Sequence, residues 1–364
     1  MTTKVAVIGV GMMGKNHARV YREIPDTDLV AVVDREPQVA EQIGRLYRVP
    51  YYNDVNEMIE RHHPEAVSVV VPTNVHHPVV LDLLNAGCHV LVEKPIASSL
   101  AEAEEMVAEA ERLGRILMVG HIERFNPAII ELKKRLLRNE LGRVFQIHAR
   151  RLSPFPVRIN DVGIMMDLGI HDLDIMRYLV GSEVLRVYSE AKTTLKNCCE
   201  DLFVSTLRFA DNTIGLLEIN WLTPAKIREL YVTGECGMFR VNYLTQDLFF
   251  FENADTHETE WTHLSLLRGV SEGSITQFAL KRVEPLRAEL DSFLTKVREQ
   301  DVTSTNCHDA IKALELVLAL SRSAISGEVQ EINSDGSTRD SLPSRTNQAV
   351  SRDRASQPSP IPAG

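Results

Sequence analysis

A glycine-rich stretch near the start of the chain has the spacing of a loop that holds a pyrophosphate. Gly9-Val10-Gly11-Met12-Met13-Gly14 directly follows an apolar run and precedes a stretch of helical character. Its glycines let the backbone turn tightly and approach the phosphates, whose charge then lies at the positive end of the following helix. In this context the pattern predicts a dinucleotide site rather than a glycine turn without a ligand.

An acidic residue further along the chain indicates which dinucleotide binds. Asp34 ends the second apolar run, about 20 residues after the glycines, where a carboxylate accepts a hydrogen bond from the ribose 2'-hydroxyl. The same charge repels a 2'-phosphate, so the sequence favours NAD over NADP as cofactor. Arg35 leaves NADP open, because a neighbouring guanidinium can receive that phosphate.

Polar residues follow the third and fourth apolar runs. Pro72-Thr73-Asn74, with His76 nearby, comes after the third run, and Glu93-Lys94-Pro95 comes after the fourth. Ligands of open parallel sheets bind beyond the carboxyl ends of the strands, so we expect Pro72, Thr73, His76 and Glu93 to contact the cofactor. Lys94 is predicted to orient a substrate hydroxyl and to stabilise the alkoxide that develops as a hydride leaves. An exposed lysine in a turn is the alternative.

A third candidate set lies within the stretch Gly163–Tyr178. Asp167, His171 and Asp174 occur at positions i, i+4 and i+7, which predicts that they share one helical face. A carboxylate one turn from an imidazole can raise its basicity and orient it for proton abstraction from a hydroxyl. A solvent-exposed polar face is the alternative. We predict no metal site, since no further cluster of ligand residues accompanies this histidine.

Five short apolar runs are predicted to be strands, and the glycine loop, Asp34 and Lys94 each follow or end one of them. They are almost continuously apolar or β-branched, as central parallel strands are, and helical stretches such as Leu100–Leu113 separate them. The alternation predicts an α/β fold whose N-terminal part, residues 1–122, is a doubly wound parallel sheet of the Rossmann type. The predicted strands are Lys4–Gly9, Leu29–Val33, Ala66–Val71, His89–Val92 and Arg115–Val119.

The pattern changes from about Arg143, where strands follow one another with short polar turns. This predicts a C-terminal α/β domain over residues 123–333, with a large open, mostly antiparallel sheet. Residues 334–364, rich in Ser and Pro, are predicted to be a disordered tail. The predicted strands are Val144–Ala149, Leu185–Glu190, Leu202–Phe209, Thr213–Trp221, Glu229–Gly234 and Gly237–Val241, the last with a candidate extension over Asn242–Glu252, and the predicted helices are Ile164–Leu179, Pro285–Val297 and His308–Ala324.

Composition excludes several classes of protein. A formal charge of −10 argues against a nucleic-acid partner, which requires a basic face. No apolar run approaches the roughly 18 to 20 residues of a membrane span, and no signal region follows Met1, so we expect a cytoplasmic protein without a membrane partner. The cysteines lack paired spacing and are predicted to be free thiols, at Cys88, Cys198, Cys199, Cys236 and Cys307.

Taken together, these motifs resemble the Gfo/Idh/MocA family of oxidoreductases. The resemblance rests on the glycine loop, Asp34, Glu93-Lys94-Pro95 and the trio Gly163, Asp167 and His171, and it covers residues 1 to about 330. It implies a Rossmann domain followed by an α/β domain whose exposed sheet face packs in oligomers, here a homodimer or homotetramer. It also implies that Lys94, Asp167 and His171 form the active site, with His171 the leading acid/base and His121 near the nicotinamide.

Longer stretches are similar to the branch of the family that includes UDP-N-acetylglucosamine 3-dehydrogenase. They include residues 118–127, 220–224, 243–248 and 284–287. The similarity implies oxidation of the sugar 3-hydroxyl to a ketone, with a pyridoxal-phosphate transaminase as functional partner. Arg124 and Arg158 are then candidate substrate residues, and Lys226 and Arg228 candidate diphosphate contacts, with surface solubility as the alternative.

Two other functions remain open at this stage. The same chemistry on a free sugar or a cyclitol such as inositol needs the same residues. A non-catalytic NAD sensor needs only the dinucleotide site, because this fold also occurs in a transcriptional co-repressor. Lys94, Asp167 and His171 argue against the sensor, since it has no use for a proton-transfer set.

Overall fold

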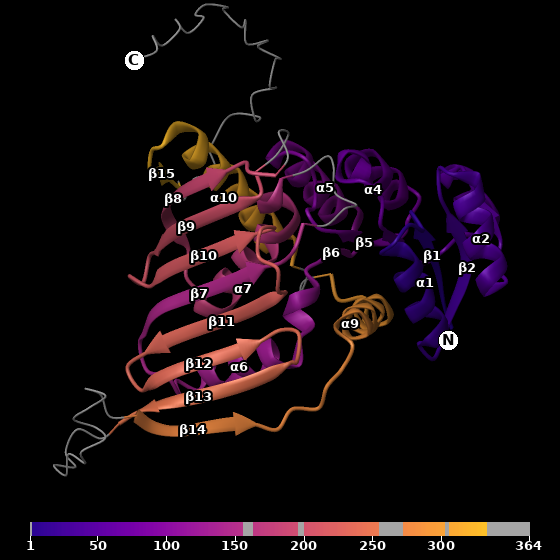
Figure 1. The fold of residues 1–364 in the computed structure, drawn as a ribbon. Helices are drawn as coiled ribbons and strands as arrows, with labels where there is room; N and C mark the ends of the chain where they lie inside the picture. Colours follow the sequence, from indigo (N-terminus) through magenta and orange to yellow (C-terminus); the bar gives the residue numbers. More distant parts are fainter. Residues whose placement is uncertain (1, 156–162, 196–199, 255–271, 303–305, 333–364) are drawn as a thin grey trace, which may run out of the picture.

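Two β-sheets lie side by side in the computed structural model, each covered by its own helices (Figure 1). The structure describes residues 2–155, 163–195, 200–254, 272–302 and 306–332. The first sheet uses the first third of the chain, and the second sheet uses most of the remainder. The predicted tail and Arg158, Cys198 and Cys199 lie outside the described residues.

The first sheet has the strand order β3-β2-β1-β4-β5-β6, and all its strands run parallel. This is the order of a doubly wound dinucleotide-binding sheet, so the predicted Rossmann architecture is confirmed. Its central strands are buried on both faces, which explains their continuous apolar character. The strands are β1 (Thr3–Ile8), β2 (Thr27–Val33), β3 (Tyr51–Tyr52), β4 (Ala66–Val69), β5 (His89–Glu93) and β6 (Leu117–Gly120).

Helices connect these strands and have local start and stop signals. The Ser99 side chain accepts the Glu102 amide at the start of α5, and Gly114 ends that helix in the left-handed region. Asp54 caps α3 in the same way. The helices of this part are α1 (Gly14–Glu23), α2 (Pro37–Tyr47), α3 (Val55–His62), α4 (His76–Asn85) and α5 (Leu100–Leu113), with short 3-10 turns η1 (Thr73–Val75) and η2 (Ile122–Phe125).

The second sheet has the order β14-β13-β12-β11-β7-β10-β9-β8-β15. Among the described strands of this second sheet, only β7 and β10 pair in parallel, so the predicted, mostly antiparallel sheet is confirmed. The strands are β7 (Val144–Leu152), β8 (Val184–Lys192), β9 (Leu202–Phe209), β10 (Ile214–Asn220), β11 (Ile227–Gly234), β12 (Gly237–Asn242), β13 (Asp247–Asn253), β14 (Glu272–Phe278) and β15 (Gln330–Glu331).

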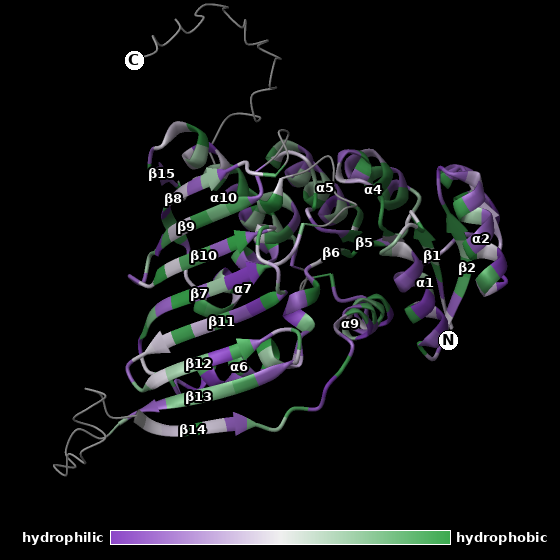
Figure 2. Cartoon of the chain, in the orientation of Figure 1, coloured by the Kyte–Doolittle hydropathy of each residue, from purple (hydrophilic) through white to green (hydrophobic). Residues whose placement is uncertain are grey.

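Helices cover only one face of this sheet. α6 (Pro127–Leu137), α7 (Ile170–Val180) and α10 (Cys307–Ser326) pack against β12, β7 and β8 and lie behind the sheet in Figure 1. Figure 2 shows hydrophobic and hydrophilic residues alternating along its strands, as expected of a sheet with one covered face. A π-helical turn, η3 (Met165–Gly169), precedes α7.

Two C-terminal features differ from the simplest interpretation of the sequence. Asn242–Glu252 does not extend β12, because the chain turns at Gln246 (φ 56°) and returns as the antiparallel strand β13. The helix α9 (Pro285–Glu299) packs on α1 and η2, and its buried residues Leu290 and Phe293 join the core of the first sheet. A division at residue 122 therefore separates α9 from the part of the molecule that it stabilises.

Two further properties of the described residues bear on the sequence predictions. Cys88 and Cys236 are free thiols, as predicted. No helix in the described ranges combines the length and apolar character needed to cross a membrane.

Candidate active site

The glycine loop between β1 and α1 leaves room where a pyrophosphate would approach. Gly9 has φ +82°, and a Cβ there would lie 2.4 Å from the Val70 carbonyl oxygen. A Cβ on Gly14 would lie 1.8 Å from the Gly9 carbonyl oxygen, so the loop and helix pack too closely for a side chain. A Cβ on Gly11 would meet nothing within 4 Å. The backbone is thus open at Gly11, as a dinucleotide cradle requires.

Asp34 lies at the end of β2 and is fixed beside this loop. Its Oδ2 accepts the Val10 amide at 2.8 Å, and its Oδ1 accepts the Glu36 amide at 3.0 Å. These bonds hold the carboxylate at the place where the ribose hydroxyls of a dinucleotide are bound in such sheets. The Arg35 side chain is 94% exposed and pairs only loosely with Glu36, at 3.7 Å.

The residues after β4 divide into exposed and buried groups. Pro72 is exposed and Thr73 half-buried, while His76 is fully buried. His76 Nδ1 lies 3.0 Å from the Pro95 carbonyl oxygen, and its Nε2 lies 2.9 Å from that of Val71. Because both ring nitrogens face carbonyl oxygens, the side chain has no polar atom left for a cofactor. We therefore leave His76 out of the proposed cofactor site.

Lys94 reaches from the end of β5 to the second domain. Its Nζ donates to the Asp167 carbonyl oxygen at 2.7 Å and lies 3.3 Å from Asp167 Oδ1. The side chains are 16% and 19% exposed, so the pair is shielded but still reachable. The structure thus brings together two of the three predicted active-site residues, at the carboxyl edge of the first sheet.

A buried chain of hydrogen bonds holds Glu93 behind Lys94. The Tyr21 hydroxyl lies 2.7 Å from Ser68 Oγ, which lies 3.2 Å from His17 Nδ1. His17 Nε2 lies 3.1 Å from Glu93 Oε1, and the Lys94 amide donates to Glu93 Oε2 at 3.2 Å. Burial alone would raise the pKa of Glu93, but the His17 hydrogen bond and the charges of His17 and Lys94 hold it below its usual value.

Sequence reasoning missed this chain, although the sequence contains a signal for it. His17 and Tyr21 are one turn apart on α1, and Ser68 is a single polar residue inside an otherwise apolar strand. A buried strand keeps such a hydroxyl only when it has a hydrogen-bond partner. This chain of hydrogen bonds therefore positions Glu93, and through the backbone it also positions the next residue, Lys94.

The turn that carries Asp167 differs from the predicted regular helix. Met165–Gly169 is π-helical, so the angular spacing of an α-helix does not apply across it. Asp167 turns to Lys94, whereas Asp174 is completely buried and pairs with Arg124. The π-helical turn therefore alters the predicted spacing of Asp167 from His171, whereas His171 and Asp174 keep theirs within α7, where Arg124 engages the Asp174 carboxylate.

His171 lies among positive charges rather than beside a carboxylate that raises its basicity. Burial lowers its pKa most, and the charges of Lys94, Arg151 and Arg228 add to this, so the pKa lies well below 6.5. The predicted rise in basicity is thus wrong. Nδ1 of His171 is buried without a hydrogen-bond partner among the described residues. The imidazole is consequently neutral at pH 7, the form that can accept a proton.

His121, predicted to lie near the nicotinamide, is 1% exposed at the end of β6. Neither ring nitrogen has a hydrogen-bond partner among the described residues, and Nδ1 lies 3.7 Å from Asp174 Oδ2. Burial lowers the pKa of His121, while the Asp174 carboxylate opposes this effect. An imidazole without a hydrogen-bond partner is costly to bury. A positive charge on His121 would lower the pKa of His171 further.

Arg124 connects helices rather than facing open space. Its guanidinium donates to both oxygens of Asp174, at 2.7 and 2.5 Å, and pairs with Asp309 at 2.9 Å. All its terminal nitrogens are thus engaged, which explains why neighbouring carboxylates hold its pKa above the usual value despite burial. Arg124 is therefore a structural link between α7 and α10, and its side chain is only 12% exposed. Arg158 cannot be placed, since it lies outside the described residues.

The arrangement can perform acid/base chemistry on a hydroxyl held at the edge of the first sheet. Lys94 offers an ammonium that can donate to the hydroxyl oxygen, and His171 offers a neutral base. The open backbone at Gly11 and the fixed Asp34 carboxylate fit a dinucleotide on the same edge. No group of three or more potential metal ligands occurs in the described ranges.

Comparisons with known proteins agree with this arrangement. Residues 3–121 match the family model of an oxidoreductase family with an NAD-binding Rossmann fold, and residues 129–240 match the Gfo/Idh/MocA C-terminal domain. UDP-N-acetylglucosamine 3-dehydrogenase from Acidithiobacillus ferrooxidans is 27% identical over 81% of this chain and 88% of its own length. Its solved structure matches with a TM-score of 0.78 at 24% identity, covering 90% of this chain and 99% of that chain.

A second relative acts on a different substrate. Myo-inositol 2-dehydrogenase from Thermotoga maritima is 32% identical over 59% of this chain and 67% of its own length. Both relatives are dehydrogenases, one of UDP-N-acetylglucosamine and the other of myo-inositol.

Proposed function

Because the chain belongs to the Gfo/Idh/MocA family of oxidoreductases and begins with an NAD-binding Rossmann domain, we propose that it oxidises the 3-hydroxyl of UDP-N-acetylglucosamine to a ketone. The observation that carries the proposal is the contact of Lys94 with Asp167, which joins the cofactor sheet to the second domain. A sensor would gain nothing from a shielded ammonium at this position.

Each residue has a distinct task in the proposed reaction. Asp34 and the glycine loop hold the cofactor, with Thr73 and Glu93 along the same sheet edge, and bound NAD supplies the hydride acceptor. Lys94 donates a hydrogen bond to the 3-oxygen and stabilises its developing negative charge. His171 takes the hydroxyl proton, which its neutral state at pH 7 allows. Asp167 orients the Lys94 ammonium.

The nucleotide sugar is supported by the length of the match to the Acidithiobacillus enzyme, which includes most of both chains. The alternative substrate is a free cyclitol, supported by the higher identity, over a shorter stretch, to the Thermotoga enzyme. Both substrates present a secondary alcohol to Lys94 and His171, so the catalytic residues do not discriminate between them.

The test is NAD reduction, followed by NADH absorbance, with a panel of UDP-sugars, free sugars and inositols. A glutamate-dependent transaminase is added to remove the ketone. We expect turnover with UDP-N-acetylglucosamine and a decrease of about a hundred- to a thousandfold for Lys94→Met, with NAD affinity nearly unchanged. Lys134→Met, at an exposed position on α6, is the control. Turnover confined to inositols would refute UDP-N-acetylglucosamine as the substrate in favour of a cyclitol. Normal turnover of Lys94→Met would refute the assignment of the site.

The proposed product suggests a functional partner. A ketone on a sugar is the substrate of pyridoxal-phosphate transaminases, which replace the oxygen by an amine. We infer that such an enzyme removes the product, since oxidation by NAD alone would accumulate an unfavourable ketone. Stimulation of net NADH formation by the transaminase, and none by an inactive variant of it, is the expected result.

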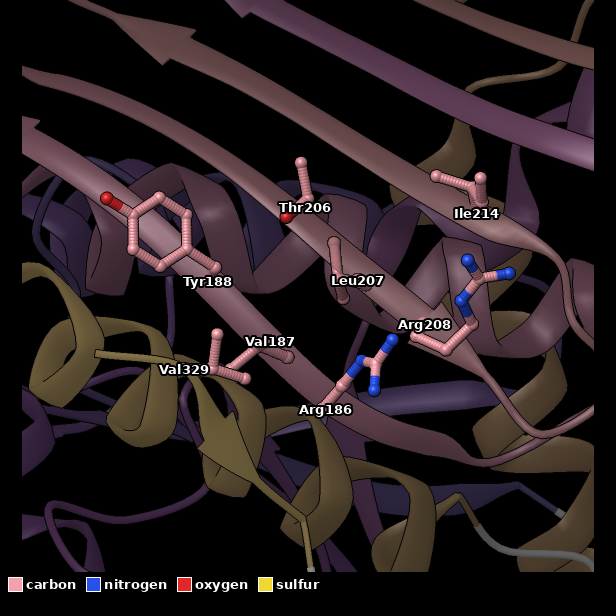
Figure 3. A pocket seen from close by; sticks show the side chains of 8 residues that line it. All are labelled: Arg186, Val187, Tyr188, Thr206, Leu207, Arg208, Ile214 and Val329. Carbon is pink, nitrogen blue, oxygen red and sulfur yellow. The ribbon is translucent and has the colours of Figure 1, made fainter. Parts of the chain in front are cut away.

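The uncovered face of the second sheet is our candidate for contact between copies of the chain. Phe145 (44% exposed), Val204 (47%) and Ile275 (59%) lie on its strands. A hollow of about 160 Å³ opens on β8, β9 and β10, and its lining, drawn in Figure 3, includes Tyr188, Ile214, Arg186 and Arg208. Light scattering should give the mass of a homodimer or homotetramer, and Val204→Arg should lower it. A monomeric wild type would refute the proposed contact.

A further inference from the structure

Two arginines face each other across neighbouring strands at the edge of the candidate site. Arg151 of β7 and Arg228 of β11 are directly opposite in the antiparallel register. Both lie on the face of the sheet that the helices cover, because Ala149 and Leu230, two residues away on each strand, are fully buried. Like charges directly opposite each other destabilise a sheet, so this pair requires an explanation.

Internal carboxylates neutralise Arg151 but hold Arg228 only weakly. Arg151 donates to Asp172 at 2.6 and 3.0 Å and to Glu123 at 3.1 and 3.2 Å. Among the described residues, the one carboxylate paired with Arg228 is that same Glu123, whose Oε1 lies 3.9 Å away. No hydrogen bond from the Arg228 guanidinium is formed with any described residue. Its side chain is 29% exposed and thus accessible to a ligand.

A third cation adds to the unbalanced charge. Lys226 is exposed two residues before Arg228. The positive charge of Arg228 lowers the pKa of Lys226, with burial and Arg151 adding to the effect. Burial and the charge of Arg151 lower the pKa of Arg228. Among the described residues, the carboxylates that act on Arg228 are Glu123, Asp172 and Asp167. The first two already pair with Arg151 and the third with Lys94, so the unbalanced positive charge lies at the exposed end.

The exposed end is close to the reacting groups. Arg151, directly opposite Arg228, donates to Asp172, which is next to His171 in the chain. The charge of Arg228 also acts on His171 and on Asp167, the carboxylate that pairs with Lys94. A ligand held by Arg228 would therefore lie within the same site as a hydroxyl between Lys94 and His171.

We propose that Arg228 and Lys226 form an anion subsite that binds the phosphate groups of a phosphorylated or nucleotide-linked sugar and so selects it over neutral sugars and cyclitols. The proposal rests on the proposed oxidation at Lys94 and His171, and it specifies the substrate class of that site. A guanidinium and an ammonium suit this role, because both donate to phosphate oxygens in charge-assisted hydrogen bonds. The anion would also offset the repulsion between Arg151 and Arg228.

The test uses the NAD-bound protein and titration calorimetry with UDP as the probe. Each charged hydrogen bond is worth about 1.5–3 kcal/mol, which corresponds to roughly a ten- to hundredfold change in affinity. We expect Lys226→Met and Arg228→Met to weaken UDP binding by this factor. Arg228→Lys should retain part of the wild-type affinity for UDP. Arg138→Met, which removes a 67% exposed arginine of similar charge, should bind UDP like the wild type. Lys226 is exposed, so its variant tests the proposal even if Arg228→Met does not fold.

Kinetics separate this proposal from the proposed substrate. If UDP-N-acetylglucosamine is oxidised, Lys226→Met should raise its KM about tenfold with little change in kcat. Unchanged UDP affinity and unchanged KM in both variants would overturn the anion subsite while leaving the oxidation intact. Loss of UDP binding in the variants, with no turnover of any nucleotide sugar by the wild type, would support the subsite and overturn the proposed substrate.

Discussion

Glu289 on α9 is a completely buried carboxyl group, and replacing it tests the electrostatics of the first domain. Neither of its oxygens has a hydrogen-bond partner among the described residues. Burial, and then the charge of Glu93, raise its pKa well above the usual 4.5. The neutral acid is therefore the form that the folded protein holds at acidic and moderately acidic pH. Glu289→Gln keeps the shape of this neutral form and removes its ionisation.

The sign and size of the effect follow from proton linkage. Below pH 4.5 the carboxyl is protonated in both the folded and the unfolded chain, so its ionisation does not affect stability. Above that pH the unfolded chain releases the proton while the folded chain retains it. The free energy of unfolding then falls by about 1.4 kcal/mol per pH unit until the folded pKa is reached. Between pH 5 and pH 7 the free energy of unfolding of the wild type should fall by as much as about 2.7 kcal/mol because of this group. That of Glu289→Gln should not show this fall.

The assay is urea unfolding of both proteins at pH 5, 6 and 7, followed by circular dichroism. The free-energy difference between Glu289→Gln and the wild type should widen in favour of the variant as the pH rises. Glu299→Gln, at an exposed position at the end of the same helix, controls for the loss of one negative charge. A difference that stays constant with pH, or that matches Glu299→Gln, would refute the reasoning.

Three further predictions concern the site. Asp34→Ala removes a charged acceptor from the Val10 amide and should weaken NAD binding about ten- to a hundredfold. NADP binding should weaken less, and equal losses for the two cofactors would contradict a contact of Asp34 with the ribose 2'-hydroxyl. Because the His171 pKa lies below 6.5, kcat/KM should stay level down to pH 6.5 and fall only in more acidic buffer, so a fall centred near pH 7 would exclude His171 as the base. His17→Ala removes one buried hydrogen bond from Ser68 and one from Glu93 and should destabilise the protein by about 1–3 kcal/mol in urea unfolding; an unchanged midpoint would contradict the hydrogen-bonded chain.

The parts of the fold that could be predicted are those with local causes. The glycine loop, Asp34 and Lys94 stand at strand ends, and strand ends follow from the apolar runs. The strand order of the first sheet then follows from the parallel alternation of strands and helices. Packing across long separations has no such local cause, which is why the return of α9 to the first core was not predicted.

The errors at the site share one physical origin, the competition among partners for a polar side chain. His76 is near the right strand end, but carbonyl oxygens of Val71 and Pro95 occupy its ring. Asp174 keeps helical spacing relative to His171 within α7, but Arg124 engages its carboxylate, and the π-helical turn alters only the spacing of Asp167. Spacing along a helix indicates which side chains can meet, and it does not indicate which partner from elsewhere in the chain binds more strongly.

The site is held together mainly by contacts between the two domains, and this has a consequence for its chemistry. Lys94 belongs to the first sheet, but its partner Asp167 belongs to the second domain. Arg124 similarly ties η2, which follows the first sheet, to Asp174 on α7 and Asp309 on α10. Buried ion pairs add little net stability but penalise any arrangement that separates them. The relative position of the two domains, rather than either sheet by itself, therefore determines the distance between the hydride acceptor and the proton acceptor.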